Sequence, residues 1–196
     1  MIINVYLVLS FYKIIRLYDI ILSISILIFF SPILITLFII CFFESQKPIF
    51  VQKRVGQDQK PFNLIKFRTM KVNTPSLASH LVKKGSVTKF GIIIRSLKLD
   101  ELPQLINVVK GEMSLVGPRP CLYNQEKLIS LREKFNIFLV KPGITGLAQI
   151  KGIDMSTPNK LTKTDRYMIS NYNQIAYFKY LFLTFFGRGI GDKIKK

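Results

Sequence analysis

The chain contains 196 residues, of which 49% are hydrophobic, and 29 Lys and Arg against 11 Asp and Glu give it a formal net charge of +18. This length allows one catalytic domain with an appendage, and the single histidine and two cysteines have no spacing that fits a zinc site. The positive charge favours partners that bear phosphate, such as anionic lipid, a nucleotide or nucleic acid, although a basic surface can also serve solubility alone.

The charge is unevenly distributed along the chain. Residues 1–46 have a net charge of zero, so the whole excess of +18 lies in residues 47–196. The two cysteines form no obvious set, which favours a reducing compartment. We therefore expect a neutral apolar segment over 1–46, followed by a basic domain over 47–196.

Residues 20–43 form an uncharged apolar run of 24 residues. A straight helix of this length reaches ~36 Å, which is enough to cross a bilayer. Pro32, preceded by Ser31, lies near the middle and kinks such a helix, and the serine hydroxyl can bond a freed carbonyl. Basic residues flank the run on both sides: Lys13, Arg16, Lys47, Lys53 and Arg54. Because basic flanks stay on the cytoplasmic side, the run is either a re-entrant helix that bends at Ser31–Pro32 or an ordinary kinked transmembrane helix.

The basic domain begins with a predicted β-hairpin. Residues 49–55 and 62–68 are rich in strand-forming side chains, and a turn signal separates them at 56–61. A polar, mobile loop is expected over 72–89, and a helix over 90–97.

Asp100 and Glu101 are the only adjacent pair of carboxylates in the sequence. Apolar residues at helical spacing follow them up to the stop at Gly111, so a helix is expected to open at Asp100, with Pro103 in its first turn. In that position Asp100 is either an N-cap and Glu101 a partner of the helix dipole, or the pair carries a metal or a nucleophile.

Two Gly/Pro loops follow. Arg119 lies between two prolines in Gly117-Pro-Arg-Pro120, and a guanidinium fixed in this way suits bidentate contact with phosphate. The loop 141–149 offers backbone N–H groups and Thr145 to an anion. The apolar, aromatic segment 175–186 is too short to span a bilayer and is expected to be an interfacial helix or a core helix.

Taken together, these stretches resemble the small monotopic phosphoglycosyl transferases, also called bacterial sugar transferases. The resemblance covers about residues 13–149. It rests on Lys13-x-x-Arg16-x-x-Asp19, Ser31-Pro32, Gln52-x-Arg54-x-Gly56, Lys66-Phe-Arg-Thr-Met70, Arg95-Ser-Leu-x-Leu-Asp-Glu-Leu-Pro-Gln-Leu-x-Asn107, Gly111-x-Met-Ser-Leu-Val-Gly-Pro-Arg-Pro120 and Pro142-Gly-Ile-Thr-Gly-x-Ala-Gln149. Many relatives carry Asn-Gly-Arg shortly after the last motif, whereas this chain has Ile153 in place of the arginine.

The resemblance implies transfer of a sugar 1-phosphate from a UDP-sugar to polyprenyl (undecaprenyl) phosphate, the first membrane step of a surface glycan pathway. It implies that Asp100 is the nucleophile, which forms a phosphosugar ester while UMP leaves, and that Glu101 is a ligand of Mg²⁺. Cationic side chains neutralise the diphosphate in such a reaction. Arg119 and Arg95 are the expected phosphate contacts, followed by Lys66 and Arg68.

The implied fold is mostly helical with a small β-hairpin. It consists of an N-terminal re-entrant membrane helix within 1–46, broken at Ser31–Pro32, and a compact catalytic domain over 47–196 on the cytoplasmic face of the bacterial inner membrane. A membrane-tethered nucleic-acid binder is the main alternative, but the aromatic residues cluster in the apolar segments and not among the basic residues. A structural membrane-surface protein leaves the carboxylate pair unexplained, so we expect membrane lipid and no nucleic acid as partners.

Overall fold

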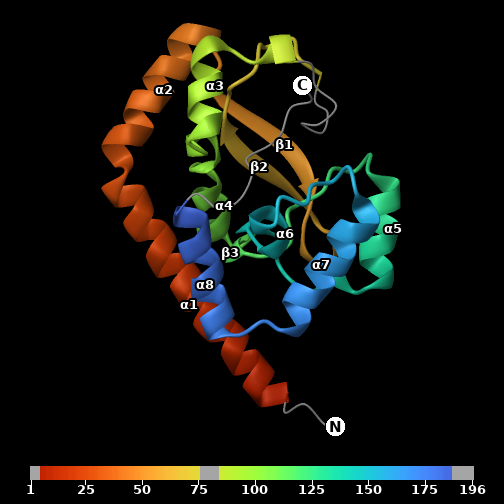
Figure 1. Ribbon diagram of the computed structural model, residues 1–196. Coiled ribbons are helices and arrows are strands. Elements are labelled where there is room, and N and C mark those ends of the chain that lie inside the picture. The colour runs from red at the N-terminus through yellow and green to blue at the C-terminus, as the bar shows by residue number, and fades with distance from the viewer. Residues whose placement is uncertain (1–4, 76–83, 187–196) are drawn as a thin grey trace.

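The computed structural model describes residues 5–75 and 84–186 (Figure 1). Its helices are α1 (Val5–Phe29), α2 (Ser31–Ser45), α3 (Lys89–Ser96), α4 (Gln104–Lys110), α5 (Glu126–Lys134), α6 (Leu147–Ile150), α7 (Pro158–Ser170) and α8 (Gln174–Phe185). Its strands are β1 (Ile49–Val55), β2 (Pro61–Phe67), β3 (Ser114–Val116) and β4 (Gly143–Thr145). The fold is therefore mostly helical with a small hairpin, as expected.

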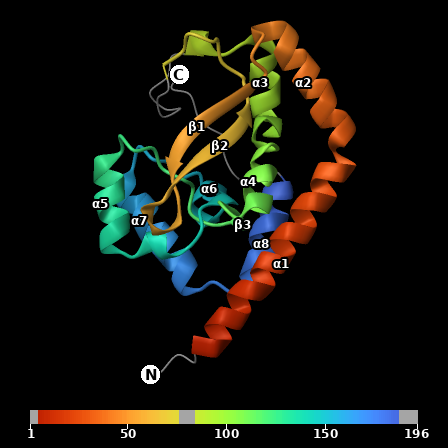
Figure 2. The same cartoon turned by 180° about the vertical axis from the view of Figure 1, so that it is seen from behind.

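Helices α1 and α2 form one long side of the molecule, and the chain bends by 66° between them (Figures 1 and 2). The bend falls at the predicted position: Pro32 lies in the first turn of α2, and the Ser31 hydroxyl donates to the carbonyl of Ile28 at 2.7 Å. Within the described residues, no single helix is long and apolar enough to cross a membrane. The bent pair Lys13–Phe29 and Ser31–Ser45 has the length and composition for it.

The predicted hairpin is confirmed as the antiparallel pair β1–β2, with Gln52 opposite Leu64 and Arg54 opposite Phe62. Because side chains alternate between the faces of a strand, these residues share one face. That face is buried although it carries polar side chains, since Gln52 and Arg54 are only 7% exposed. Lys66, opposite Phe50, is on the same face and is equally buried. The hairpin thus directs charged groups inward, toward the pocket described below.

The two Gly/Pro loops, which are distant in sequence, pack directly against each other. β3 immediately precedes the first loop and β4 lies within the second, and these strands form a short parallel ladder that we did not predict. Gly117 donates to the carbonyl of Thr145 at 2.8 Å, and Gly143 donates to that of Pro118 at 2.9 Å. A Cβ atom on Gly143 would lie 2.0 Å from the Gly117 nitrogen, so this contact requires glycine.

Polar residues of α1 attach the bent helix pair α1–α2 to the rest of the domain. Arg16 donates to the carbonyls of Val108 and Val109, at 2.6 and 2.9 Å, and so satisfies the C-terminal end of α4. The buried Asp19 accepts hydrogen bonds from the Leu115 amide and the Tyr177 hydroxyl, both at 2.9 Å. The basic and acidic positions of the first motif are therefore structural links to β3, α4 and α8.

Helices α3 and α8 have the predicted positions, and each has a side-chain cap. The Thr88 hydroxyl accepts from the Gly91 amide at 3.1 Å, and the Asn173 side chain accepts from Ala176 at 2.8 Å. Residues 76–83 of the expected loop 72–89 lie outside the described part of the chain.

The expected helix start at Asp100 is wrong. A 3₁₀ turn covers Leu99–Glu101, and α4 begins four residues later than expected, with Pro103 as its N-cap. The turn follows Lys98, whose φ of 58° ends the α3 segment sharply. Asp100 is therefore not the N-cap of α4, and the capping interpretation fails.

Candidate active site

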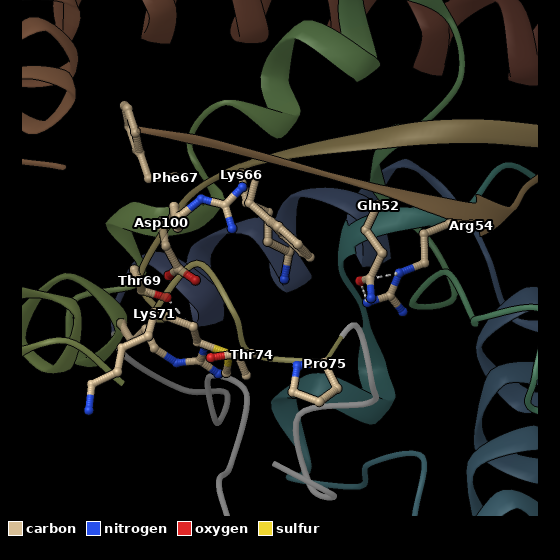
Figure 3. A pocket seen from close by; sticks show the side chains of 13 residues that line it. Gln52, Arg54, Lys66, Phe67, Thr69, Lys71, Thr74, Pro75 and Asp100 are labelled. Carbon is tan, nitrogen blue, oxygen red and sulfur yellow. Dashed lines mark hydrogen bonds between the residues drawn. The ribbon is translucent and has the colours of Figure 1, made fainter. Parts of the chain in front are cut away.

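The candidate site is a small pocket between the hairpin, the end of α3 and the 3₁₀ turn Leu99–Glu101 (Figure 3). Asp100 lines it and is 5% exposed. Figure 3 shows Asp100 beside Thr69, with Lys66 between Asp100 and the bonded pair Gln52 and Arg54. Among the described residues the cationic members of the lining are Arg54, Lys66, Arg68, Lys71 and Arg95. A single carboxylate thus faces a strongly positive pocket, which suits an anionic substrate.

The 3₁₀ turn that carries Asp100 packs against α2 of the bent helix pair. Leu99 packs into a cluster with Leu37 and Cys41 of α2, Phe67 of β2 and Ile94 of α3. Two hydrogen bonds hold the turn itself, from Glu101 to the carbonyl of Lys98 and from Leu102 to that of Leu99, both at 3.3 Å. Asp100 is therefore fixed by packing on one side and faces the pocket on the other.

Glu101 lies outside that lining and forms the centre of a charge cluster. Its Oε1 atom accepts hydrogen bonds from Arg119 Nη2 at 2.8 Å and from Lys66 Nζ at 3.3 Å. The Glu101 side chain is only 13% exposed, so these ion pairs are weakly screened by solvent. Burial lowers the pKa of the nearby Lys98, and the negative charge of Glu101 opposes this shift.

Arg119 is held by its main chain as well as by its two prolines. Its carbonyl accepts from Arg132 Nη1 at 2.7 Å, and the carbonyl of Pro120 accepts from Arg54 Nη1 at 2.9 Å. The Val55 amide of the hairpin donates to Cys121 at 3.0 Å. The loop that presents Arg119 is therefore anchored on three consecutive carbonyls.

The other predicted phosphate contacts differ in their surroundings. Arg95 lines the pocket and donates to the Thr69 hydroxyl at 3.3 Å. Arg68 also lines it, but its guanidinium donates to the carbonyls of Lys47 and Ile49 and stacks on Phe50. Arg68 therefore has a structural function in addition to any contact with substrate.

Thr145 is not brought to this pocket. It is 5% exposed and its hydroxyl is hydrogen-bonded to that of Thr184 in α8. The structure thus brings Asp100, Lys66, Arg68 and Arg95 together in one lining, with Glu101 and Arg119 next to it, and separates Thr145 from them.

Comparison with known proteins identifies the family. Residues 11–188 match the family model of the bacterial sugar transferases. The chain belongs to the bacterial sugar transferase family.

Individual relatives are similar over most of this transferase. It is 39% identical over 170 residues to the uncharacterized sugar transferase EpsL of Bacillus subtilis, covering 86% of this chain and 84% of that protein. It is 42% identical over 181 residues to the UDP-glucose:undecaprenyl-phosphate glucose-1-phosphate transferase of Klebsiella pneumoniae, covering 87% and 39%. The Escherichia coli protein of the same name is 40% identical, with coverage of 86% and 38%. The chain thus spans less than two fifths of the length of these two longer relatives.

Sequence reasoning missed Gln52 and Arg54 as site residues of this sugar transferase. Both belong to the motif Gln52-x-Arg54-x-Gly56. Their spacing was a second signal, because they are polar side chains at alternate positions of a strand and share one face of the hairpin with Phe62 and Leu64. A buried arginine on such a face needs partners, and Arg54 has them in Gln52 Oε1 and the carbonyl of Pro120.

The two carboxylates of the site suit a magnesium ion that takes only one or two of its ligands from the protein. Within the described residues there is no group of three or more metal-ligating side chains. Mg²⁺ nevertheless commonly takes one or two carboxylates and fills its remaining positions with water and substrate phosphates. Asp100 and Glu101 are adjacent in the sequence and carry carboxylate oxygens of this kind, so their chemistry is compatible with such an ion.

Proposed function

We propose that this chain transfers a sugar 1-phosphate from a UDP-sugar to polyprenyl phosphate through an ester on Asp100. The observation that carries the proposal is the buried Asp100 carboxylate in a pocket lined by cationic residues. Relatives named as UDP-glucose:undecaprenyl-phosphate glucose-1-phosphate transferases support the same reaction.

The reaction proceeds in two displacements at one phosphorus atom. An oxygen of Asp100 attacks the phosphorus that bears the sugar, the bond between this phosphorus and the bridging oxygen breaks, and UMP leaves with the electron pair. An oxygen of polyprenyl phosphate then attacks the same phosphorus, which breaks the ester and regenerates the carboxylate. Positioning and charge neutralisation provide most of the catalysis in such a transfer. Lys66, Arg95 and Arg119 supply positive charge on the side of the pocket where the diphosphate binds.

A bound Mg²⁺ would neutralise charge on the diphosphate as a Lewis acid. Glu101 is the proposed protein ligand, together with Asp100 before its esterification. Lys66 and Arg119 hold Glu101 Oε1 in place and so orient the carboxylate.

The proposed location of the site is the membrane surface, on the cytoplasmic face of the bacterial inner membrane. Helices α2, α3 and α8 lie on the same side of the molecule as α1 (Figures 1 and 2). They expose large apolar side chains, which include Ile35, Phe38, Phe42 and Phe43 on α2, Phe90, Ile92 and Ile93 on α3, and Phe178, Phe182 and Phe185 on α8. An apolar face of this extent suits burial in a lipid interface. A soluble UDP-sugar and a lipid-borne phosphate can both reach a pocket placed there.

Release of UMP tests the proposal directly. The purified protein, in bilayer nanodiscs with Mg²⁺, is incubated with a panel of UDP-sugars, with and without polyprenyl phosphate. We expect turnover of UMP only when polyprenyl phosphate is present, with a polyprenyl diphosphate sugar as product. Absence of turnover with every donor would contradict the proposed function, and tight nucleic-acid binding at physiological salt would favour the alternative.

Arg119→Lys is expected to lower kcat/KM at least tenfold, which is ~1.4 kcal/mol of transition-state stabilisation. Lysine keeps the charge but loses the planar fork that contacts two oxygens at once. The measurement is UMP release at several donor concentrations. Arg166→Lys is a matched control, because Arg166 is exposed on α7 and stacks on Phe135. A fully active Arg119→Lys protein would refute the bidentate contact.

The membrane hairpin is expected to enter and leave on the cytoplasmic side. Single cysteines at Asn4 or Lys47, in a Cys41→Ser and Cys121→Ser background, should both label with an impermeant maleimide only from that side. Replacement of Ser31–Pro32 by Ala–Leu should straighten the helix and move residue 4 across, since a continuous apolar helix of 24 residues is long enough to span. Labelling of wild-type position 4 from the periplasmic side would show an ordinary transmembrane helix instead.

A further inference from the structure

A buried ion pair lies behind the loop that carries Arg119. Arg132 of α5 and Asp165 of α7 are joined by a hydrogen bond of 2.7 Å between Nη2 and Oδ2. Their side chains are 2% and 1% exposed, so both charges are removed from water almost completely. Neither residue lines the pocket or belongs to the motifs that carry the family resemblance.

Stability alone is a poor explanation for this pair. Removing two charges from water is costly, and well-packed apolar residues in the same place are often as stable or more stable. Burial raises the pKa of the Asp165 carboxyl, while the charge and hydrogen bond of Arg132 oppose this rise. Asp165 Oδ1 and Arg132 Nε have no hydrogen-bond partner among the described residues. The pair is thus incompletely satisfied as a structural element.

The other terminal nitrogen of the Arg132 guanidinium, Nη1, indicates a role in positioning. Nη1 donates to the carbonyl of Arg119 at 2.7 Å, and Nη2 of Arg119 donates to Glu101 at 2.8 Å. Asp165, Arg132, Arg119 and Glu101 therefore form a continuous chain of contacts from α7 to the residue next to Asp100. Arg54 holds the following carbonyl, that of Pro120, so two buried arginines fix consecutive peptide groups of this loop.

We propose that Arg132 and Asp165 act as a positioning pair, which fixes the peptide of Arg119 so that its guanidinium meets the substrate phosphate and Glu101. Asp165 orients the guanidinium of Arg132, and Arg132 fixes the Arg119 carbonyl. The catalytic part of this inference rests on the proposed function. Displacement of reacting groups by about 1 Å can cost a large factor in rate, so loss of this fixation reduces turnover even in a stable protein.

The double variant Arg132→Met/Asp165→Leu separates positioning from stability. It removes both charges and retains side chains of suitable bulk, so the protein should unfold at the same temperature as the wild type or higher. We expect kcat to fall at least tenfold in this folded protein, with a smaller change in KM. Full activity in a stable double variant would overturn the proposal.

Two further variants distinguish a loss of positioning from a loss of stability. Arg132→Lys keeps a charge for Asp165 but lacks the fork that reaches both partners, so it should lose activity without losing the fold. Leu161→Ala is the matched control on α7: it weakens the same buried region, where Leu161 packs in an apolar cluster with Cys121 and Leu128, and it removes no charge. Leu161→Ala should have a lower unfolding temperature and unchanged kcat where it is folded. If kcat in all these variants follows unfolding temperature, the pair is merely structural.

A double-mutant cycle shows whether the effect passes through Arg119. In an Arg119→Ala background, removal of the Arg132–Asp165 pair should change kcat less than twofold, because the group that it positions is already absent. Fully additive losses would mean that the pair acts elsewhere.

The proposal also has a readout that does not need turnover. The side-chain Nε–H resonance of Arg119, assigned by its loss in Arg119→Lys, should shift in the double variant and stay in place in Leu161→Ala. If the wild type transfers no sugar phosphate, the proposed function fails while this resonance still decides the positioning. An unshifted resonance would overturn the positioning whatever the activity.

Discussion

Asp100→Asn is expected to abolish transfer while the chain still folds. Asparagine has nearly the same shape, but its neutral amide cannot form the phosphosugar ester. We expect a loss of at least a thousandfold in kcat, which corresponds to ~4 kcal/mol of barrier. Since Asp100 does not cap α4, the change removes no capping hydrogen bond from that helix.

UMP release and mass spectrometry check this prediction together. Wild-type protein incubated with a UDP-sugar alone should gain the mass of the phosphosugar on the peptide that contains Asp100, and the variant should not. Asp58→Asn is the matched control, because it makes the same chemical change in the hairpin turn, at a residue that does not line the pocket. Activity of Asp100→Asn within tenfold of wild type would exclude Asp100 as the nucleophile.

Glu101→Gln is expected to lower activity severely and to raise the Mg²⁺ concentration needed for half-maximal rate. The amide keeps one oxygen for Lys66 and Arg119 but loses the charge that both cations pair with. It is also a much weaker ligand for a hard cation than a carboxylate. Two effects therefore act together, one on the metal and one on the position of Arg119.

Titration of Mg²⁺ in the activity assay separates these two effects. A shift of the half-maximal concentration reports the metal, and a lower plateau at saturating Mg²⁺ reports the displaced Arg119. Glu112→Gln is the matched control at the other end of α4, where Glu112 accepts a hydrogen bond from Asn107. An unchanged Mg²⁺ dependence in Glu101→Gln would remove Glu101 from the metal site.

Local signals predicted the elements whose contacts are local. The hairpin follows from strand-forming residues on both sides of a turn signal, and α3 and α8 follow from short apolar stretches. The start of α4 was misplaced because apolar spacing does not distinguish the 3₁₀ turn Leu99–Glu101 from the first turn of a helix. The left-handed backbone of Lys98, which separates α3 from this turn, has no sequence signal, since lysine rarely adopts it.

Contacts between distant segments were not predictable from one sequence. The ladder of β3 and β4 joins three-residue strands, one directly before the first Gly/Pro loop and one within the second, and these segments are paired only in the folded chain. Arg132 and Asp165 resemble ordinary surface charges of polar helices, and their burial depends on how α5 packs against α7. Within the site, the motifs pointed to Asp100, Lys66, Arg68 and Arg95, which line one pocket, but not to the sharing of one Glu101 oxygen by Lys66 and Arg119.

The packing of Leu99 against Leu37 and Cys41 connects the turn that carries Asp100 to α2, the helix that is proposed to lie in lipid. A helix that enters a bilayer changes its tilt when the hydrocarbon thickness changes. If α2 is embedded as proposed, such a tilt moves the residues that support Asp100, with no change in either substrate. Bilayer thickness and lateral pressure would then act on this transferase as regulators of its rate, through the same few apolar contacts that hold Asp100 in place.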